Sequence, residues 1–191
     1  SSFFLFCDYA LNKYKNINEI MMVSGTNYLG ENIISNKYVY SQHYLIWGWA
    51  TWKRAWQSYD VSMKNWLDEN VKNKIRKRYN KLEYKFLNDK FNSFFSNYSD
   101  TWDIQWYFSC IENNGLTIMP ETNLVTNIGM IGTHSTQYYK TLFLKNNEID
   151  VDKIIPPKKI IRDFKFDEKL HKKYHFKNQY YEKIKAFLKK M

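Results

Sequence analysis

Tryptophans gather in one short segment of this chain. Four of the seven lie within ten consecutive positions, residues 47–56, and Trp47 and Trp49 flank Gly48. The face of an indole ring packs well on the apolar C–H face of a sugar ring. Trp47 and Trp49 are therefore candidates for a platform that binds carbohydrate, with burial in a hydrophobic core as the alternative.

The second half of this segment predicts a helix that starts near Thr51, after a turn at Gly48. Trp52 and Trp56 would share one face of it, because side chains four positions apart on a helix are neighbours. Burial is the interpretation that we favour for both. The basic pair Lys53-Arg54 would turn to another face.

Asp103 stands at the start of the clearest helical pattern in the chain. Apolar residues recur after it at helical spacing, and Asn113-Asn114-Gly115 ends the pattern. A carboxylate at this place could remove a proton from a reacting hydroxyl group. The alternative is a charge that favours the helix N-terminus and pairs with a cap at Asp100, an effect of about 0.3–1 kcal/mol.

Histidines and paired acids give the remaining candidates for chemistry. His134 follows a glycine-containing segment, and on spacing alone it is a loop residue with an ordinary hydrogen bond. His171 and His175 are four positions apart but lack the glutamate of a zinc hydrolase motif, so chance explains them better. Chance also explains Asp150-Val151-Asp152, because so short a pattern arises easily in a chain that contains acids.

Two cysteines cannot form a disulfide framework, and we expect a reducing compartment. Cys110 lies on the Asp103 helix without a nearby histidine, which favours a core residue over a nucleophile.

The elements that must position these residues alternate between helices and short strands. The expected elements are a helix capped by Ser1-Ser2 that ends near Lys15, strands at 20–23 and 38–40, and a helical region over 66–95. A helix that starts within 100–103 and continues to Ile111 follows, and then a strand at 116–119 that ends at Pro120. This order predicts an α/β fold with a mixed sheet flanked by helices. We expect one domain over residues 1–157 and a basic, helical tail over residues 158–191.

The chain of 191 residues carries a net charge of +10, which attracts phosphates, nucleic acid or anionic lipid. No stretch approaches the ~18 apolar residues of a membrane span, so we expect a soluble protein.

Four motifs in this order resemble a known family: WGWATWKRAW, TWDIQWYFSCIENNG, LTIMP and GMIGTH. The chain resembles the C-terminal, acceptor-side half of GT-A glycosyltransferases, and it looks most like the bacterial family 2 type, over about residues 1–162. In such enzymes a wall that contacts the acceptor corresponds to residues 48–56, with Lys53 and Arg54. Asp103 corresponds to the base of an inverting transfer, and Trp102 stands where the family has a first acid.

The resemblance implies several partners and a cofactor. They are a nucleotide-diphosphate sugar as donor, a glycan or lipid-linked glycan as acceptor, and Mn²⁺ or Mg²⁺ with His134 as one ligand. The donor-binding half, with its Asp-x-Asp motif, is expected upstream of Ser1, so this chain alone would be inactive. Bacterial surface-polysaccharide assembly is the expected setting.

Two other functions are open. One is a non-catalytic carbohydrate-binding or interaction domain. The other is a basic nucleic-acid-binding module, which we disfavour because the aromatics follow helix-core spacing and no RNA-binding motif is visible. We expect a cytoplasmic protein whose tail, with Tyr181, Ile184 and Leu188 among lysines, makes weak contact with the inner face of the membrane. Packing of this stripe on the domain is the alternative.

Overall fold

The computed structural model describes residues 2–30, 35–96, 101–126 and 145–176. Four strands form one sheet in the order β2-β4-β1-β3. The strands are β1 (Ile20–Ser24), β2 (Tyr38–Ser41), β3 (Trp49–Thr51) and β4 (Leu116–Pro120). Strands β1 and β4 run parallel in the middle, and the two outer strands run antiparallel to their neighbours. The predicted α/β class with a mixed sheet is confirmed.

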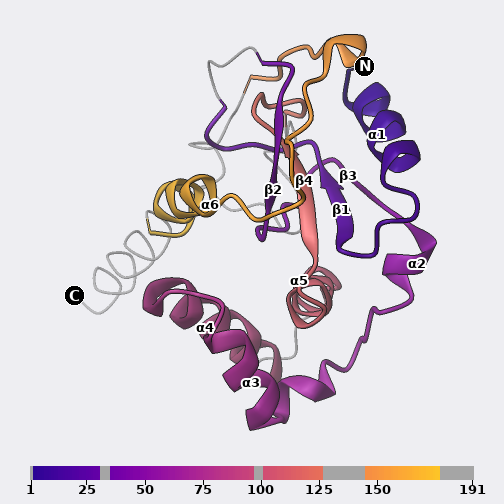
Figure 1. Cartoon of the computed structure of the whole chain (residues 1–191). Helices are drawn as coiled ribbons and strands as arrows, with labels where there is room; N and C mark the ends of the chain where they lie inside the picture. Colours follow the sequence, from indigo (N-terminus) through magenta and orange to yellow (C-terminus); the bar gives the residue numbers. More distant parts are fainter. Residues whose placement is uncertain (1, 31–34, 97–100, 127–144, 177–191) are drawn as a thin grey trace.

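Helices lie around this sheet (Figure 1). They are α1 (Ser2–Lys13), α2 (Lys53–Trp56), α3 (Glu69–Arg76), α4 (Lys81–Ser96), α5 (Asp103–Glu112) and α6 (Phe164–Leu170), with short 3-10 turns at Lys64–Leu67 and Val151–Lys153 and a π-helical turn at His171–Phe176. In Figure 1, α1 and α6 lie on opposite sides of the strands, and α3, α4 and α5 lie together below them. Among the described residues, no helix is both long and apolar enough to cross a bilayer.

Two hydrophobic clusters hold the layers together. In one, Phe6 and Ala10 of α1 pack on Ile20 and Val23 of β1. In the other, Met22 of the same strand packs among side chains from α3, α4 and α5. Met22 and Val23 are successive strand residues and point to opposite faces. The register between β1 and β4 shifts between Ile20 and Met22, and Ile20 lies in the same cluster as Val23, so this short apolar strand supplies both cores.

A cluster of tyrosine hydroxyls joins α1 to the edge strand β2. Tyr14 hydrogen-bonds to the hydroxyl of Tyr38 and, at 2.6 Å, to that of Tyr40. The three rings meet edge to face. Burial, with the hydrogen bonds from Tyr14 next, raises the pKa of Tyr38 and Tyr40. The side chains of Tyr38 and Tyr40 therefore stay neutral over the ordinary pH range.

The prediction of one continuous helical region over 66–95 is wrong. Two polar caps divide it. The Asp68 carboxylate accepts from the backbone N–H of Asn70 and starts α3. The Asn80 side chain accepts from the backbone N–H groups of Leu82 and Glu83, while Glu83 accepts from the N–H of Asn80. This reciprocal capping box starts α4. The helix axis therefore changes, and the predicted apolar stripe leaves Leu82 in solvent.

The segment after Gly48 also differs from the expectation. Residues 49–51 form strand β3 on the edge of β1, and α2 is a single turn. Gly48 has a φ of +63°, a left-handed conformation that glycine adopts without strain. A Cβ on Gly48 would also lie 2.4 Å from a side-chain carbon of Val125. The turn needs glycine for both reasons.

Residues 158–176 of the predicted tail form part of the packed fold. The side chains of Asp167 and Leu170 on α6 are fully buried. The backbone N–H of Asp163 donates to the carbonyl oxygen of Tyr40 at 2.8 Å and so joins the segment before α6 to β2.

Candidate functional site

Trp49 and Trp102 meet on one face of the molecule, although they are far apart in the sequence. Their rings stack with centroids 5.1 Å apart and an interplanar angle of 26°. Trp49 begins β3, and Trp102 is the residue directly before α5. The stack therefore brings the Gly48-Trp49 turn against the helix that Asp103 starts.

A second aromatic pair extends this surface. Trp56 and Tyr59 stack with centroids 4.6 Å apart, nearly parallel at 6°. The fully buried Trp106 lies under both pairs, with its ring centroid 6.1 Å from that of Trp49 and 5.0 Å from that of Trp56. We call Trp49, Trp56, Tyr59 and Trp102 the aromatic patch. Trp56 is 38% exposed and Trp102 is 40% exposed, so solvent or a ligand can reach it.

The expected burial is confirmed for Trp52 and wrong for Trp56. Trp52 is buried, and its indole N–H donates to the Leu11 carbonyl oxygen at 3.0 Å. Because α2 has only four residues, Trp56 lies at its end and packs on the aromatic patch instead of the core.

Trp47 lies apart from Trp49. Its ring meets that of Tyr28 edge to face at 6.2 Å, and it packs against a cluster with Leu45 and Met119. The left-handed turn at Gly48 sends the two flanking tryptophans to different neighbours. Of the pair expected to form a sugar platform, the aromatic patch contains Trp49 alone.

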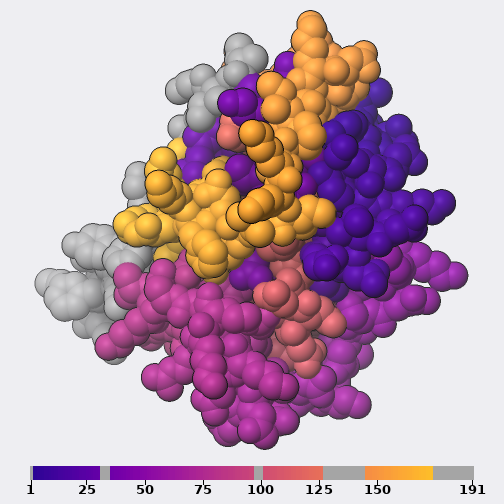
Figure 2. Space-filling view, in the orientation of Figure 1, coloured from indigo at the N-terminus to yellow at the C-terminus, as the bar shows by residue number. Residues whose placement is uncertain are grey.

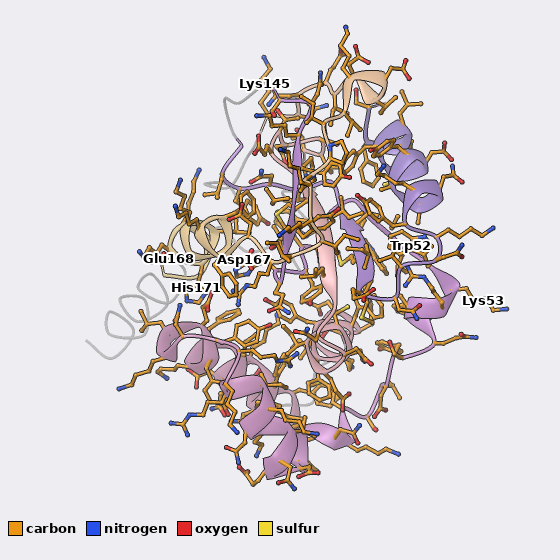
Figure 3. The ribbon with its side chains drawn as sticks, viewed as in Figure 1. Trp52, Lys53, Lys145, Asp167, Glu168 and His171 are labelled. Atoms are coloured by element: carbon orange, nitrogen blue, oxygen red, sulfur yellow. The ribbon has the colours of Figure 1, made fainter. Side chains whose placement is uncertain are left out.

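The two basic residues at the start of α2, Lys53 and Arg54, also have different surroundings. The Arg54 guanidinium donates to the carbonyl oxygens of Tyr14 and Lys15, each at 2.9 Å, and lies over the Trp52 ring. It thereby ties α2 to the end of α1. Lys53 is exposed and projects away from the molecule (Figure 3).

Asp103 is the first residue of α5 and is half-buried. Burial lowers the pKa of Lys90 on α4, and the charge of Asp103 opposes that shift. Burial raises the pKa of Tyr59, and the charges of Asp103 and Asp60 add to the shift. A carboxylate, an ammonium group and a phenol therefore lie within electrostatic reach of one another beside the aromatic patch.

The neighbouring Asp60 is held in its ionised form. Hydrogen bonds from the Ser62 hydroxyl at 2.6 Å and the Ser62 backbone N–H at 2.9 Å lower its pKa. Sequence reasoning did not single out Asp60 or Lys90. An aspartate two positions before a serine is a common turn pattern, so the sequence around Asp60 does not indicate that it lies beside the aromatic patch.

The metal-ligand candidates are not assembled in the described part of the chain. His134 lies outside the described residues. Asp150 caps the Val151–Lys153 turn and pairs with Lys153 at 2.8 Å, which is a local structural role. No group of three or more His, Cys, Asp or Glu side chains among the described residues could hold a metal ion. Cys7 and Cys110 are free and buried, as expected.

Sequence reasoning missed a buried charged cluster between α4, α6 and β2. The Arg162 guanidinium donates to Glu83 at 2.7 Å and to Asp167 at 2.6 Å. Asp167 also accepts from the Ser41 hydroxyl at 2.5 Å and from the Gln42 backbone N–H at 3.0 Å. Glu83 and Ser41 are too distant in the sequence from Arg162 and Asp167 to form a motif with them. Figure 3 shows Asp167 and His171 on the side of α6 toward the strands, with Glu168 farther out.

Two histidines complete this cluster. The rings of His43 and His171 lie 6.2 Å apart, and His43 Nε2 lies 3.2 Å from the Asp167 carbonyl oxygen. Burial lowers the pKa of both rings. The hollow beside them measures about 10 Å³, room for at most one water. The cluster therefore has a structural role and leaves no space for a substrate.

The chain was compared with protein-family models, with curated proteins and with solved structures, and none of them matched. Any functional conclusion therefore depends on the residues and geometry described above.

Proposed function

We propose that this chain forms the acceptor side of a GT-A type, family 2-like bacterial glycosyltransferase that uses a nucleotide-diphosphate sugar. The stack of Trp49 on Trp102 carries the proposal. Two motifs that suggest the family, WGWATWKRAW and TWDIQWYFSCIENNG, meet through this contact. Neither composition nor the net charge requires the two segments to touch.

The aromatic patch is suited to a sugar acceptor. Trp56 and Trp102 are partly exposed and offer apolar surface to the C–H face of a pyranose ring. Asp60 and Asp103 supply hydrogen-bond acceptors for sugar hydroxyls beside it. An acceptor glycan, free or lipid-linked, would lie across Trp102 with one hydroxyl toward α5.

Asp103 is the proposed general base. In an inverting transfer, an acceptor hydroxyl attacks the anomeric carbon, the bond to the nucleoside diphosphate breaks, and a carboxylate takes the hydroxyl proton. Asp103 starts α5 at the edge of the aromatic patch, where a bound acceptor could approach it. Lys90 on α4 lies within electrostatic reach of Asp103 and supplies positive charge beside it.

The proposal includes Mn²⁺ or Mg²⁺ in the complete enzyme, with His134 as one ligand. The described residues offer no cluster of metal ligands, and the other ligands would be the donor diphosphate and the Asp-x-Asp motif of the donor-binding half. The cation would neutralise charge on the departing diphosphate.

Asp103→Asn in the full-length gene product tests the proposal. With a panel of nucleotide sugars and glycan acceptors, we expect turnover to fall by a factor on the order of 10² or more, with unchanged urea denaturation. Glu112→Gln, at the other end of α5, is the matched control and should keep wild-type turnover. Wild-type transfer by Asp103→Asn would overturn the assignment of the base.

The same patch also supports a non-catalytic carbohydrate-binding domain. One experiment distinguishes the two functions. In the full-length protein, a non-catalytic binding domain would retain glycan on the aromatic patch but would release no nucleoside diphosphate from any donor. Loss of glycan binding together with loss of transfer on Trp102→Ala would favour the transferase.

A further inference from the structure

A segment of the C-terminal region lies over the open edge of the sheet. We call residues 154–165 the strap. The Ile155 backbone N–H donates to the Asn36 carbonyl oxygen at 3.0 Å, and the Asp163 N–H donates to that of Tyr40 at 2.8 Å. Figure 2 shows the strap, in orange and gold, crossing the visible face of the molecule. These hydrogen bonds hold it beside β2.

The strap presents large apolar side chains to solvent. Ile161 is 64% exposed and Phe164 is 66% exposed. Between them, the Arg162 side chain is only 7% exposed and is bound to Glu83 and Asp167. Ile161, next to the inward-held Arg162, remains outside, and the ring of Phe164 lies over the Arg162 guanidinium, with the ring centroid 4.8 Å from it. Exposed apolar groups that lie close together on a protein surface often mark a site of interaction.

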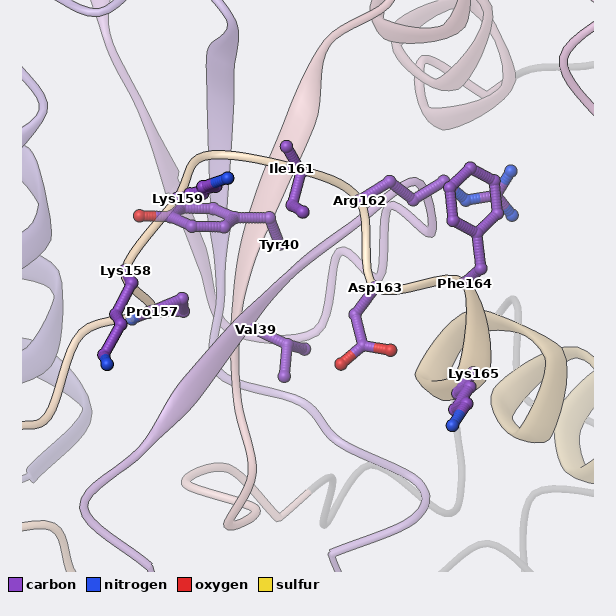
Figure 4. Close-up of a pocket in the computed structure, with 10 residues that line it drawn as sticks. All are labelled: Val39, Tyr40, Pro157, Lys158, Lys159, Ile161, Arg162, Asp163, Phe164 and Lys165. Carbon is purple, nitrogen blue, oxygen red and sulfur yellow. The ribbon is translucent and has the colours of Figure 1, made fainter.

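A groove of about 580 Å³ lies along the strap, with Val39 and Tyr40 of β2 in its wall. The apolar part of its lining from the strap is Pro157, Ile161 and Phe164, and its basic part includes Lys158, Lys159 and Lys165 (Figure 4). The lining thus combines apolar surface with three exposed ammonium groups.

The positive charge of this groove is not neutralised in the described part of the chain. There, no carboxylate lies within 4.0 Å of Lys158, Lys159 or Lys165. The acid of the lining, Asp163, accepts the backbone N–H of Phe166 and caps α6. Arg162 carries one positive charge against the two negative charges of Glu83 and Asp167, so it adds no net positive charge to the groove. The three lysines therefore face solvent as an excess of positive charge.

We propose that the strap and its groove bind anionic lipid at a membrane surface. Lysines would meet the headgroup phosphates, and Ile161 and Phe164 would enter the boundary between headgroups and acyl chains. Among its lysines the groove lining exposes one large aliphatic side chain, Ile161, and one aromatic ring, Phe164. Successive bases of a nucleic acid stack on several aromatic faces, so a single exposed ring beside an aliphatic side chain fits a lipid better. The surface is built from other residues than the Tyr181 to Leu188 stripe, and the inference does not depend on the proposed enzymatic activity.

The test is co-sedimentation of the full chain with vesicles of phosphatidylglycerol and phosphatidylcholine, or of phosphatidylcholine alone, at low and high salt. We expect binding only to the anionic vesicles, and weakening by salt. Each lysine near an anionic surface increases the binding constant about fivefold. The double variant Lys158→Glu and Lys159→Glu should therefore bind at least about tenfold more weakly at low salt.

A second variant, Ile161→Ser with Phe164→Ser, tests the apolar contact and should also lose most binding. The matched controls lie on and near α3, where Lys74→Glu with Lys77→Glu and Val61→Ser with Leu67→Ser change equally exposed residues. Urea denaturation confirms that every variant folds. Equal binding to both vesicles, no binding at all, or strap variants that bind like the controls would each overturn the proposal. Loss of binding only on deletion of residues 180–191 would assign it to the tail instead.

Discussion

Arg162 and Asp167 form an ion pair at 2.6 Å inside the protein, where the Asp167 side chain is fully buried. The same guanidinium reaches Glu83 on α4. Through one side chain, the strap is fixed to α6 and to α4. The pair therefore determines both how the C-terminal region packs and which of its side chains remain in solvent.

Loss of this arginine should be costly. Arg162→Ala leaves two buried carboxylates without their cation, and we expect a loss of about 3–5 kcal/mol in the free energy of unfolding. Lys85→Ala, which breaks the exposed pair of Lys85 with Asp89 at 2.7 Å, should cost no more than about 1 kcal/mol. Urea denaturation of both variants measures the difference, and similar losses would contradict the structural role of Arg162.

The buried histidines predict an acid-sensitive fold. Folding lowers the pKa of His43 and His171, chiefly by burial, so the native state binds fewer protons than the unfolded state. This contribution to stability is complete above the ordinary histidine pKa of about 6.5 and is lost as the pH falls below it. The charges of Asp167 and Glu83 oppose the lowering of the His43 pKa, while the charge of Arg162 adds to it.

Denaturation of the wild type and of His43→Gln between pH 8 and pH 5 checks this prediction. The glutamine does not titrate, so the variant should lose less stability over this interval than the wild type. Identical pH slopes would show that His43 is not responsible for the acid sensitivity.

Trp102→Ala should weaken glycan binding with little loss of stability, because Trp102 is substantially exposed. We expect about tenfold weaker binding of an acceptor glycan, the effect of losing one aromatic face from a sugar site. Quenching of tryptophan fluorescence by acceptor glycans measures it. Trp47→Phe lies outside the aromatic patch and is the control that should bind like the wild type.

This chain by itself should bind Mn²⁺ poorly. One imidazole at His134 cannot hold a hard divalent cation without oxygen ligands, and the described residues offer no cluster of ligands. Calorimetry with MnCl₂ should detect no binding stronger than the millimolar range. Tight binding by this chain would require a metal site built in another way.

Local pattern was sufficient for the regular elements. The apolar runs at 20–23 and 116–119 and the periodicity after Asp103 predict β1, β4 and α5 within about a residue. These segments combine a consistent apolar pattern with a clear stop, at Ser24-Gly25, Pro120 or Asn114-Gly115. Such signals act between neighbours in the chain, so the sequence alone contains them.

Only the tertiary structure decided which residues form a site. β3 has three residues and exists because β1 offers it hydrogen-bond partners. Trp56 was expected in the core and lies on the aromatic patch, since Trp106 and Tyr59 pack against it from other segments. The pairing of Arg162 with Glu83 spans 79 positions. Such contacts depend on the arrangement of whole elements in space, whereas sequence spacing reports only on the element to which a residue belongs.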